Sequence, residues 1–249
     1  MTDPPRWTGA RSISAHLVEQ RFYVARSTGE VPAVAWLPLT TAPCPLVLLG
    51  HGGSGHKANQ RNVDLATHLA SCGVASLAID GPCHGERVAA PAYQQLIAER
   101  GIGVVTEQMI DDWRAAIAAL ATRGAVATSR LGYVGLSMGT RWGLPLCAAL
   151  GEDLRAAVVG KFGLRSSLES YAGREGTQLI RRSAQAITAP VLFHLPWDDE
   201  IFPREGQLEL FDLLGSRTKR LIADSGSHGD TDAHAPVTWA SFIVGHLGP

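Results

Sequence analysis

The sequence predicts an α/β fold, in which a mainly parallel twisted sheet carries helices on both faces. Short apolar runs alternate with segments whose apolar residues recur three and four positions apart, a pattern typical of parallel sheets. Of the 249 residues, 45% are hydrophobic and 18% charged, so a packed core is available. The length fits one domain. We expect that domain over residues 1–249, with a loose N-terminal segment over 1–15 and a short cap-like insertion over 161–189.

The first elements are an antiparallel hairpin and one strand–helix unit. Residues 22–25 and 31–37 flank a turn at Thr28-Gly29-Glu30, which predicts the hairpin. Residues 45–49 form a short apolar run ending at Gly50, which indicates a buried strand. A helix with Leu65, Leu69 and Cys72 on one face then ends at Gly73.

The strand–helix alternation continues to the C-terminus. Apolar runs predict the remaining strands at 74–79, 131–134, 156–159, 191–195 and 220–223. Helical spacing predicts longer helices at 109–120, 138–150, 203–215 and from 236 onward, and short ones at 91–100 and 178–186. In a parallel sheet ligands bind beyond the carboxyl ends of the strands, so the residues that follow each strand are the candidates for chemistry.

The clearest of these segments is Gly135-Leu136-Ser137-Met138-Gly139, between a predicted strand and a predicted helix. This G-x-S-x-G pattern in that context is typical of a nucleophilic serine on a tight turn, where side chains at the glycines would collide with the adjoining elements. The helix N-terminus also favours developing negative charge. We therefore predict Ser137 as a nucleophile, against the alternative of a chance glycine-rich turn.

A second glycine-rich segment, Gly50-His51-Gly52-Gly53-Ser54-Gly55, follows the strand at 45–49. Small residues let backbone N–H groups point into a site, as an oxyanion hole requires. A phosphate-binding loop is disfavoured because the spacing does not match G-x-G-x-x-G and no G-K-[S/T] follows. We expect the oxyanion donors to be the N–H groups of Met138 and Gly53.

Two later segments supply the partners that an activated serine needs. Asp198, Asp199 and Glu200 follow the strand at 191–195, and an acid there could orient a histidine. His228 lies among small residues after the last strand, where it could reach across the strand tips. The residue types alone do not show which of the three acids would pair with His228.

Together these motifs resemble α/β-hydrolase fold serine hydrolases, closest to the small dienelactone-hydrolase-like esterases. The serine, acid, histidine order is that of the fold, and Asp199 to Pro203 matches the family's Asp-x-x-x-Pro segment, so the resemblance implies Asp199 as the acid, with Asp198 as the alternative. Dienelactone hydrolases proper use a cysteine nucleophile. Serine at position 137 therefore favours hydrolysis of carboxylic esters, without a cofactor.

Four aromatic residues and one acidic cluster are further candidates for a pocket and for a metal site. Trp142, Phe162, Trp197 and Phe202 follow strand ends or flank the serine turn, so they are candidates for lining a substrate pocket, with the core as the alternative. Asp230, Asp232 and His234 lie near His228, but a solvated loop explains them better than a metal site. We expect no metal and no cofactor.

Charge and hydropathy limit the remaining function classes. A net charge of −1 gives no field to attract nucleic acid or an anionic membrane. No apolar run has the length of a membrane span and the polar start carries no signal segment, so we expect a cytoplasmic protein; the oligomeric state stays open.

The segments expected to form the walls of the site, the insertion at 161–189 and the short helix at 91–100, are both short. They leave the site open and shallow, so we predict short-chain ester substrates. Thioesterase, amidase and acyltransferase activities remain alternatives, as does a non-catalytic hydrolase-like binding module.

Overall fold

A computed structural model of the chain describes residues 4–40, 43–87, 93–166 and 173–248. Its centre is one nine-stranded sheet with the order β1-β2-β3-β5-β4-β6-β7-β8-β9. The first three strands run antiparallel to their neighbours, and β4 to β9 are parallel. The strands are β1 (Arg6–Ser14), β2 (Leu17–Arg26), β3 (Gly29–Pro38), β4 (Cys44–Gly50), β5 (Ala75–Ile79), β6 (Val126–Gly135), β7 (Leu154–Gly160), β8 (Val191–Pro196) and β9 (Lys219–Asp224).

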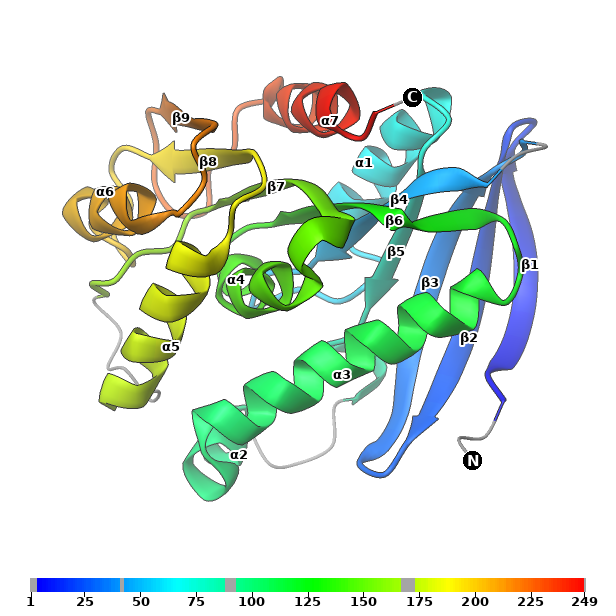
Figure 1. Cartoon of the computed structure of the whole chain (residues 1–249), viewed down its shortest axis with the longest axis horizontal. Coiled ribbons are helices and arrows are strands. Elements are labelled where there is room, and N and C mark those ends of the chain that lie inside the picture. Colours follow the sequence, from blue (N-terminus) through cyan, green and yellow to red (C-terminus); the bar gives the residue numbers. More distant parts are fainter. Residues whose placement is uncertain (1–3, 41–42, 88–92, 167–172, 249) are drawn as a thin grey trace.

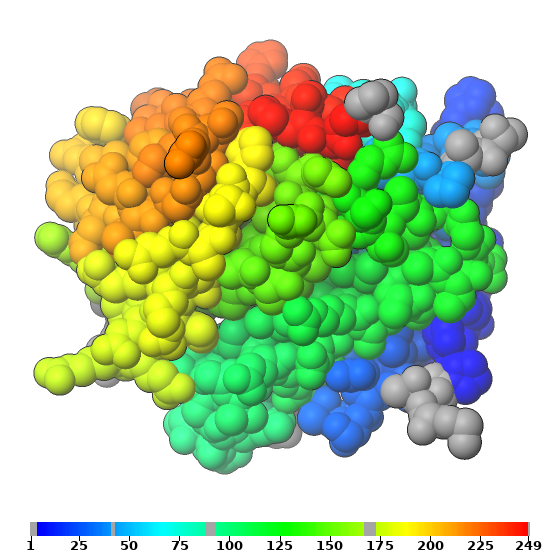
Figure 2. Space-filling view, viewed as in Figure 1, coloured from blue at the N-terminus to red at the C-terminus, as the bar shows by residue number. Residues whose placement is uncertain are grey.

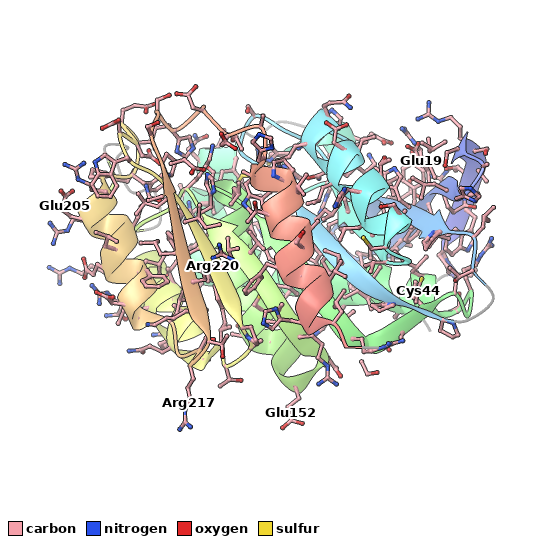
Figure 3. The ribbon with its side chains drawn as sticks, turned by 90° about the horizontal axis from the view of Figure 1, so that it is seen from above. Glu19, Cys44, Glu152, Glu205, Arg217 and Arg220 are labelled. Atoms are coloured by element: carbon pink, nitrogen blue, oxygen red, sulfur yellow. The ribbon has the colours of Figure 1, made fainter. Side chains whose placement is uncertain are left out.

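Helices cover both faces of the sheet, as predicted. On one face α1 and α7 lie side by side (Figure 3), and they pack against the sheet through buried residues that include Leu65 of α1 and Trp239 of α7. On the other face α3 and α4 pack against the strands, and α5 lies between α6 and the segment of α2 and α3 (Figures 1 and 2). The helices are α1 (Gln60–Ser71), α2 (Tyr93–Arg100), α3 (Ile102–Ala121), α4 (Met138–Leu150), α5 (Gly173–Ala186), α6 (Arg204–Leu213) and α7 (Ala235–His246).

The expectation of a loose segment over residues 1–15 is wrong for Arg6–Ser14. These residues form β1, which pairs antiparallel with β2 through a register containing two irregularities. The pairing comes from backbone hydrogen bonds and from Trp7, whose ring lies 4.5 Å from that of Phe22. Most β1 residues are exposed, and the apolar residues Trp7, Ala10 and Ile13 recur at every third position instead of every second, so the strand carries no hydrophobic alternation and its sequence looks like a coil.

The segments expected to wall the site surround the carboxyl end of the sheet. Helix α5 lies between β7 and β8, within the predicted insertion at 161–189, of which residues 167–172 lie outside the described residues. The short helix expected over 91–100 begins at Tyr93, and Pro91 lies outside the described residues as well. In the described part of the chain, no helix combines the length and the apolar character that crossing a membrane requires.

Candidate active site

Ser137 occupies the tight turn between the last residue of β6 and the first residue of α4. Its φ of 59° and ψ of −120° lie in a region that side-chain-bearing residues rarely adopt. The turn is held from both sides: the Ser137 N–H donates to the Gly160 carbonyl (2.9 Å), and the Thr140 hydroxyl contacts the carbonyls of Gly135 (2.8 Å) and Gly160 (2.6 Å). The surrounding hydrogen bonds therefore compensate the strained backbone and keep the serine exposed to the site.

Tyr133 supports this turn from beneath. It is fully buried, and its hydroxyl donates to the Gly139 carbonyl at 2.5 Å. A methyl group added at Gly50, Gly135 or Gly143 would overlap its ring or hydroxyl. At Gly139 an added Cβ would lie 3.2 Å from the Gly50 carbonyl oxygen. The glycines of the serine motif thus leave room for Tyr133 and for the close approach of β4 to α4.

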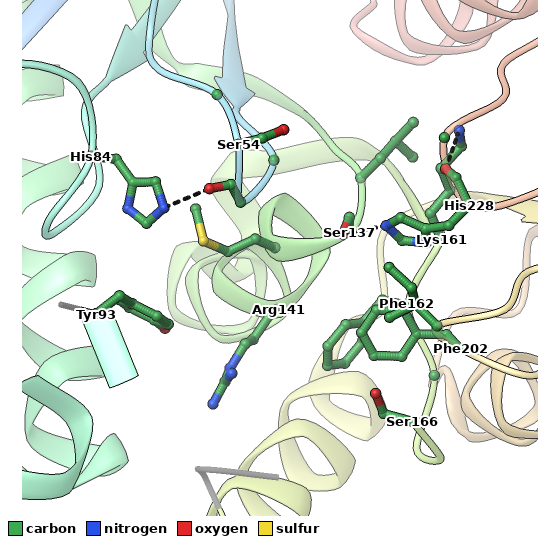
Figure 4. A pocket seen from close by; sticks show the side chains of 18 of the residues that line it. Ser54, His84, Tyr93, Ser137, Arg141, Lys161, Phe162, Ser166, Phe202 and His228 are labelled. Atoms are coloured by element: carbon green, nitrogen blue, oxygen red, sulfur yellow. Dashed lines mark hydrogen bonds between the residues drawn. The ribbon is translucent and has the colours of Figure 1, made fainter. Parts of the chain in front are cut away.

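The three residues predicted as nucleophile, base and acid are brought together. Ser137 Oγ lies 2.9 Å from His228 Nε2, and His228 Nδ1 lies 2.9 Å from Asp199 Oδ2. They come from the turn after β6, from the loop after β9 and from the loop after β8, which meet at the carboxyl end of the parallel strands. Figure 4 shows Ser137 and His228 facing each other in a cavity.

The structure distinguishes the neighbouring acids. Asp199 is buried, whereas Asp198 and Glu200 are exposed. Besides His228, Asp199 accepts hydrogen bonds from the N–H groups of Ile201 (2.9 Å) and Phe202 (2.8 Å) and from the Gln207 amide. Burial on its own raises the pKa of the Asp199 carboxyl, but the hydrogen bonds from His228 and the backbone outweigh it and lower the pKa below its ordinary value. The carboxylate is therefore kept charged beside the imidazole.

Glu200, one of the three candidate acids, and Lys161, which no sequence motif marks, hold the His228 loop. The Glu200 carboxylate accepts the His228 N–H at 2.9 Å. Lys161, directly after β7, is 5% exposed, and its ammonium donates to the carbonyls of His228 (3.2 Å) and Asp230 and to the Thr231 hydroxyl. Nothing local marks either residue for this role, because their partners are 28 to 70 positions away in the chain.

The glycine-rich loop after β4 lies beside Ser137, as expected. Met138 and Gly53 both line the cavity, and Met138 begins α4, where the first N–H groups have no partner within the helix. His51 fixes the loop: its Nε2 accepts the Gly81 N–H (2.9 Å), and its Nδ1 contacts the Gly52 carbonyl (2.8 Å). Burial lowers the pKa of His51 to about 4, so the ring is neutral at pH 7.

The cavity above Ser137 has a volume of about 1300 Å³. Of the four aromatic residues expected in a pocket, Phe162 and Phe202 line it. The other two do not. Trp142 is 3% exposed on the inner side of α4 and packs edge-on against Tyr93, so it belongs to the core. Trp197 is 47% exposed and stacks with the Arg204 guanidinium instead.

The acidic residues near His228 have partners within their own loop. Asp230 accepts hydrogen bonds from the backbone and hydroxyl of Ser227, and Asp232 accepts the N–H of His234. Among the described residues, no group of three histidine, cysteine or acidic side chains is arranged to hold a metal ion.

Comparison with known proteins identifies a family, one solved structure that is similar in sequence and fold, and one that is similar in fold alone. A sequence model described as the dienelactone hydrolase family matches residues 31–216. The chain is 31% identical to a PEG-bound, cold-adapted esterase from an Arctic intertidal metagenomic library, with a TM-score of 0.83 over 97% of this chain and 99% of that one. An acetyl xylan esterase from Paenibacillus sp. R4 shares the fold at 17% identity, with a TM-score of 0.76 over 97% and 88%. Among curated proteins no match is found.

Proposed function

Since the chain belongs to the dienelactone hydrolase family, we propose that it hydrolyses carboxylic esters through a covalent acyl-enzyme on Ser137. The observation that carries the proposal is the continuous hydrogen-bonded series from Asp199 through His228 to Ser137, which opens into a cavity. A non-catalytic binding module would have no need for a serine on a strained turn with a base 2.9 Å away. The esterase that is 31% identical supports an ester as the substrate.

The proposed reaction has two stages. Ser137 Oγ attacks the ester carbonyl while His228 Nε2 accepts the serine proton and passes it to the departing alcohol oxygen. Water, deprotonated by His228, then attacks the acyl-enzyme and releases the acid. Asp199 holds the imidazole in one orientation and stabilises its cation. The N–H groups of Met138 and Gly53 stabilise the oxyanion.

We propose short acyl chains for the substrate. The wall near Gly53 includes the polar side chains His84, Gln94 and Arg141, and a long alkyl chain placed against it would displace the water around these groups without forming hydrogen bonds itself. Hydrolysis of p-nitrophenyl acetate and p-nitrophenyl laurate tests this, and a higher kcat/KM for laurate would contradict it.

We also propose that the protein works in the cytoplasm as one hydrolase domain. The cysteines Cys44, Cys72, Cys83 and Cys147 are all free thiols in the structure, which fits a reducing compartment. Fractionation of the source cells, followed by detection of the protein in each fraction, tests the location.

The direct experiment is covalent labelling with a small fluorophosphonate. The reagent should phosphonylate Ser137 in the native protein, because it reacts with serines that an adjacent base activates. Peptide mass spectrometry should place the label on Ser137 alone, and the Ser137→Ala variant should take up none. Ester turnover by a protein that stays unlabelled would contradict the acyl-enzyme mechanism.

A further inference from the structure

The cavity has two chemically different sides. On the side of His228 the lining combines the apolar side chains Phe162, Leu164, Ile201 and Phe202 with the polar side chains Lys161, Ser166 and Thr231. On the side of Gly53 it is polar, with His84, Tyr93, Gln94 and Arg141. Figure 4 shows Ser137 between the two, with Phe162, Phe202 and His228 on one side and His84 and Tyr93 on the other.

Ring contacts tie the two phenylalanines to the base. The Phe202 ring lies 5.7 Å from the His228 ring, and Phe162 lies 4.8 Å from Phe202. On the polar side, His84 lies 2.9 Å from the Gly53 carbonyl and 5.7 Å from the Tyr93 ring. Each side is thus anchored to a different part of the proposed machinery, Phe202 to the base and His84 to the oxyanion loop.

The proton transfer from His228 to the leaving oxygen determines which side of the cavity holds the alcohol part of the ester and which holds the acyl part. When Ser137 Oγ bonds to the carbonyl carbon, the bond between that carbon and the alcohol oxygen must break. The alcohol oxygen takes the proton that His228 Nε2 received from Ser137, so it must come within hydrogen-bond reach of that nitrogen. With the carbonyl oxygen at Met138 and Gly53, the leaving alcohol lies toward His228, and the acyl chain is directed away from it.

The backbone that carries both aromatic side chains is held in place by contacts with the start of α6. The Phe202 N–H donates to Asp199 (2.8 Å) and its carbonyl accepts from Gln207 (2.7 Å). Beside Phe162, a Cβ at Gly163 would lie 2.7 Å from the Gln207 backbone nitrogen, and the Leu164 N–H donates to the Gly206 carbonyl (3.0 Å). Both rings are half-buried and line the cavity. Such partly exposed aromatic surface on a held backbone binds apolar groups at little entropic cost.

We propose that the substrate is an ester of an aromatic, apolar alcohol, whose ring binds against Phe162 and Phe202. The inference rests on the proposed function, because it uses His228 as the group that protonates the leaving oxygen. It adds that selectivity for the alcohol part comes from these two phenylalanines. The acyl part contacts the polar side and is selected independently.

The test compares benzyl acetate with methyl acetate. The two alcohols have nearly equal acidity and the acyl-enzyme is identical, so kcat/KM, which reports acylation, isolates the alcohol subsite. We expect benzyl acetate to be favoured by at least about tenfold, the scale on which apolar pockets discriminate. Phe162→Ala should bring this preference within about threefold of unity. Phe162→Leu, a milder change for folding, should give an intermediate preference.

Two controls separate the subsite from general damage. Phe211 is also half-buried, with its ring 6.0 Å from that of Phe193, but it does not line the cavity; Phe211→Ala should keep the benzyl preference. The ratio of kcat/KM for methyl butyrate to methyl acetate, which varies only the acyl part, should be the same in Phe162→Ala as in the native protein.

The outcomes distinguish this inference from the function on which it rests. Equal kcat/KM for benzyl and methyl acetate, with Ser137 still labelled and p-nitrophenyl acetate still hydrolysed, would overturn the alcohol subsite and leave the esterase intact. A full benzyl preference in Phe162→Ala would also overturn it. Failure to label Ser137 or to hydrolyse any ester would overturn both proposals.

Discussion

Asp199 and Asp198 are adjacent in sequence but lie in opposite environments. Asp199 is buried with four hydrogen-bond donors around its carboxylate, whereas Asp198 is exposed. Asp199→Asn should lower kcat by about 10³–10⁴-fold, as for other triad aspartates, because it favours the wrong imidazole tautomer. Asp198→Asn is the matched control and should stay close to native activity. Steady-state kinetics with p-nitrophenyl acetate gives both values, and the reverse order of losses would reassign the acid.

Lys161 acts on His228, the proposed base, through the backbone of the His228 loop. Lys161→Met removes its donors to the carbonyls of His228 and Asp230 and to the Thr231 hydroxyl. We expect kcat to fall by about 10- to 100-fold with little change in KM, because a small displacement of a catalytic group is costly.

Lys219 offers a matched control for this change. Its ammonium also has three acceptors, the carbonyls of Phe211, Asp212 and Leu214 at the end of α6. Lys219→Met should lower the free energy of unfolding without changing kcat. A native kcat in Lys161→Met, with the fold intact by circular dichroism, would show that the His228 loop does not need this lysine.

Because α4 packs closely against β6, replacing a glycine of α4 by alanine should destabilise the protein, the opposite of the usual effect in a helix. In an open helix, Gly→Ala stabilises by up to about 1 kcal/mol. At Gly143 the added methyl would overlap the Tyr133 ring, so Gly143→Ala should destabilise by about 1–3 kcal/mol. Gly245 in α7 has open space around it, and Gly245→Ala should be neutral or stabilising. Urea unfolding measures both, and stabilisation by Gly143→Ala would show that Tyr133 does not fill this position.

Local sequence patterns predicted most elements because each pattern is a property of neighbouring residues. The apolar runs that became β4 to β8 and the serine turn are of this kind, and the parallel sheet then brought Ser137, Asp199 and His228 together. Strand β1 was missed because its pairing, not its side chains, makes it a strand. Trp142 follows the core alternative, and Trp197 lies in neither the pocket nor the core, for a related reason. Which face of a helix or loop meets the cavity depends on packing between distant elements, here with Tyr93 and Arg204.

The stability of the whole molecule should depend on pH through two buried histidines. Burial lowers the pKa of both His51 and His194 to about 4, and the nearby Lys161 charge contributes at His194. In the unfolded chain a histidine titrates near 6.5. Below that pH the unfolded state binds protons that the folded state excludes, so stability is complete above about pH 6.5 and falls toward pH 4.

Once the histidines of the unfolded chain are protonated, each should lower the free energy of unfolding by about 1.4 kcal/mol for every unit by which the pH falls. Urea unfolding at pH 7, 6, 5 and 4.5 measures this slope. His194→Phe should reduce the slope by about half, because it removes one of the two titrating groups and keeps a ring against Trp239. A free energy of unfolding that stays constant from pH 7 to 4.5 would contradict this account.

The central claim for the molecule is that one serine carries the reaction, and the Ser137→Ala variant tests it most directly. Removing one hydroxyl oxygen leaves the core unchanged, so circular dichroism and the unfolding midpoint should match the native protein. Hydrolysis of p-nitrophenyl acetate should then fall by several orders of magnitude, toward the losses on the order of 10⁶ seen when a triad serine is removed. A folded Ser137→Ala variant that keeps more than about a tenth of native kcat/KM, against the 10⁶-fold precedent, would contradict the account.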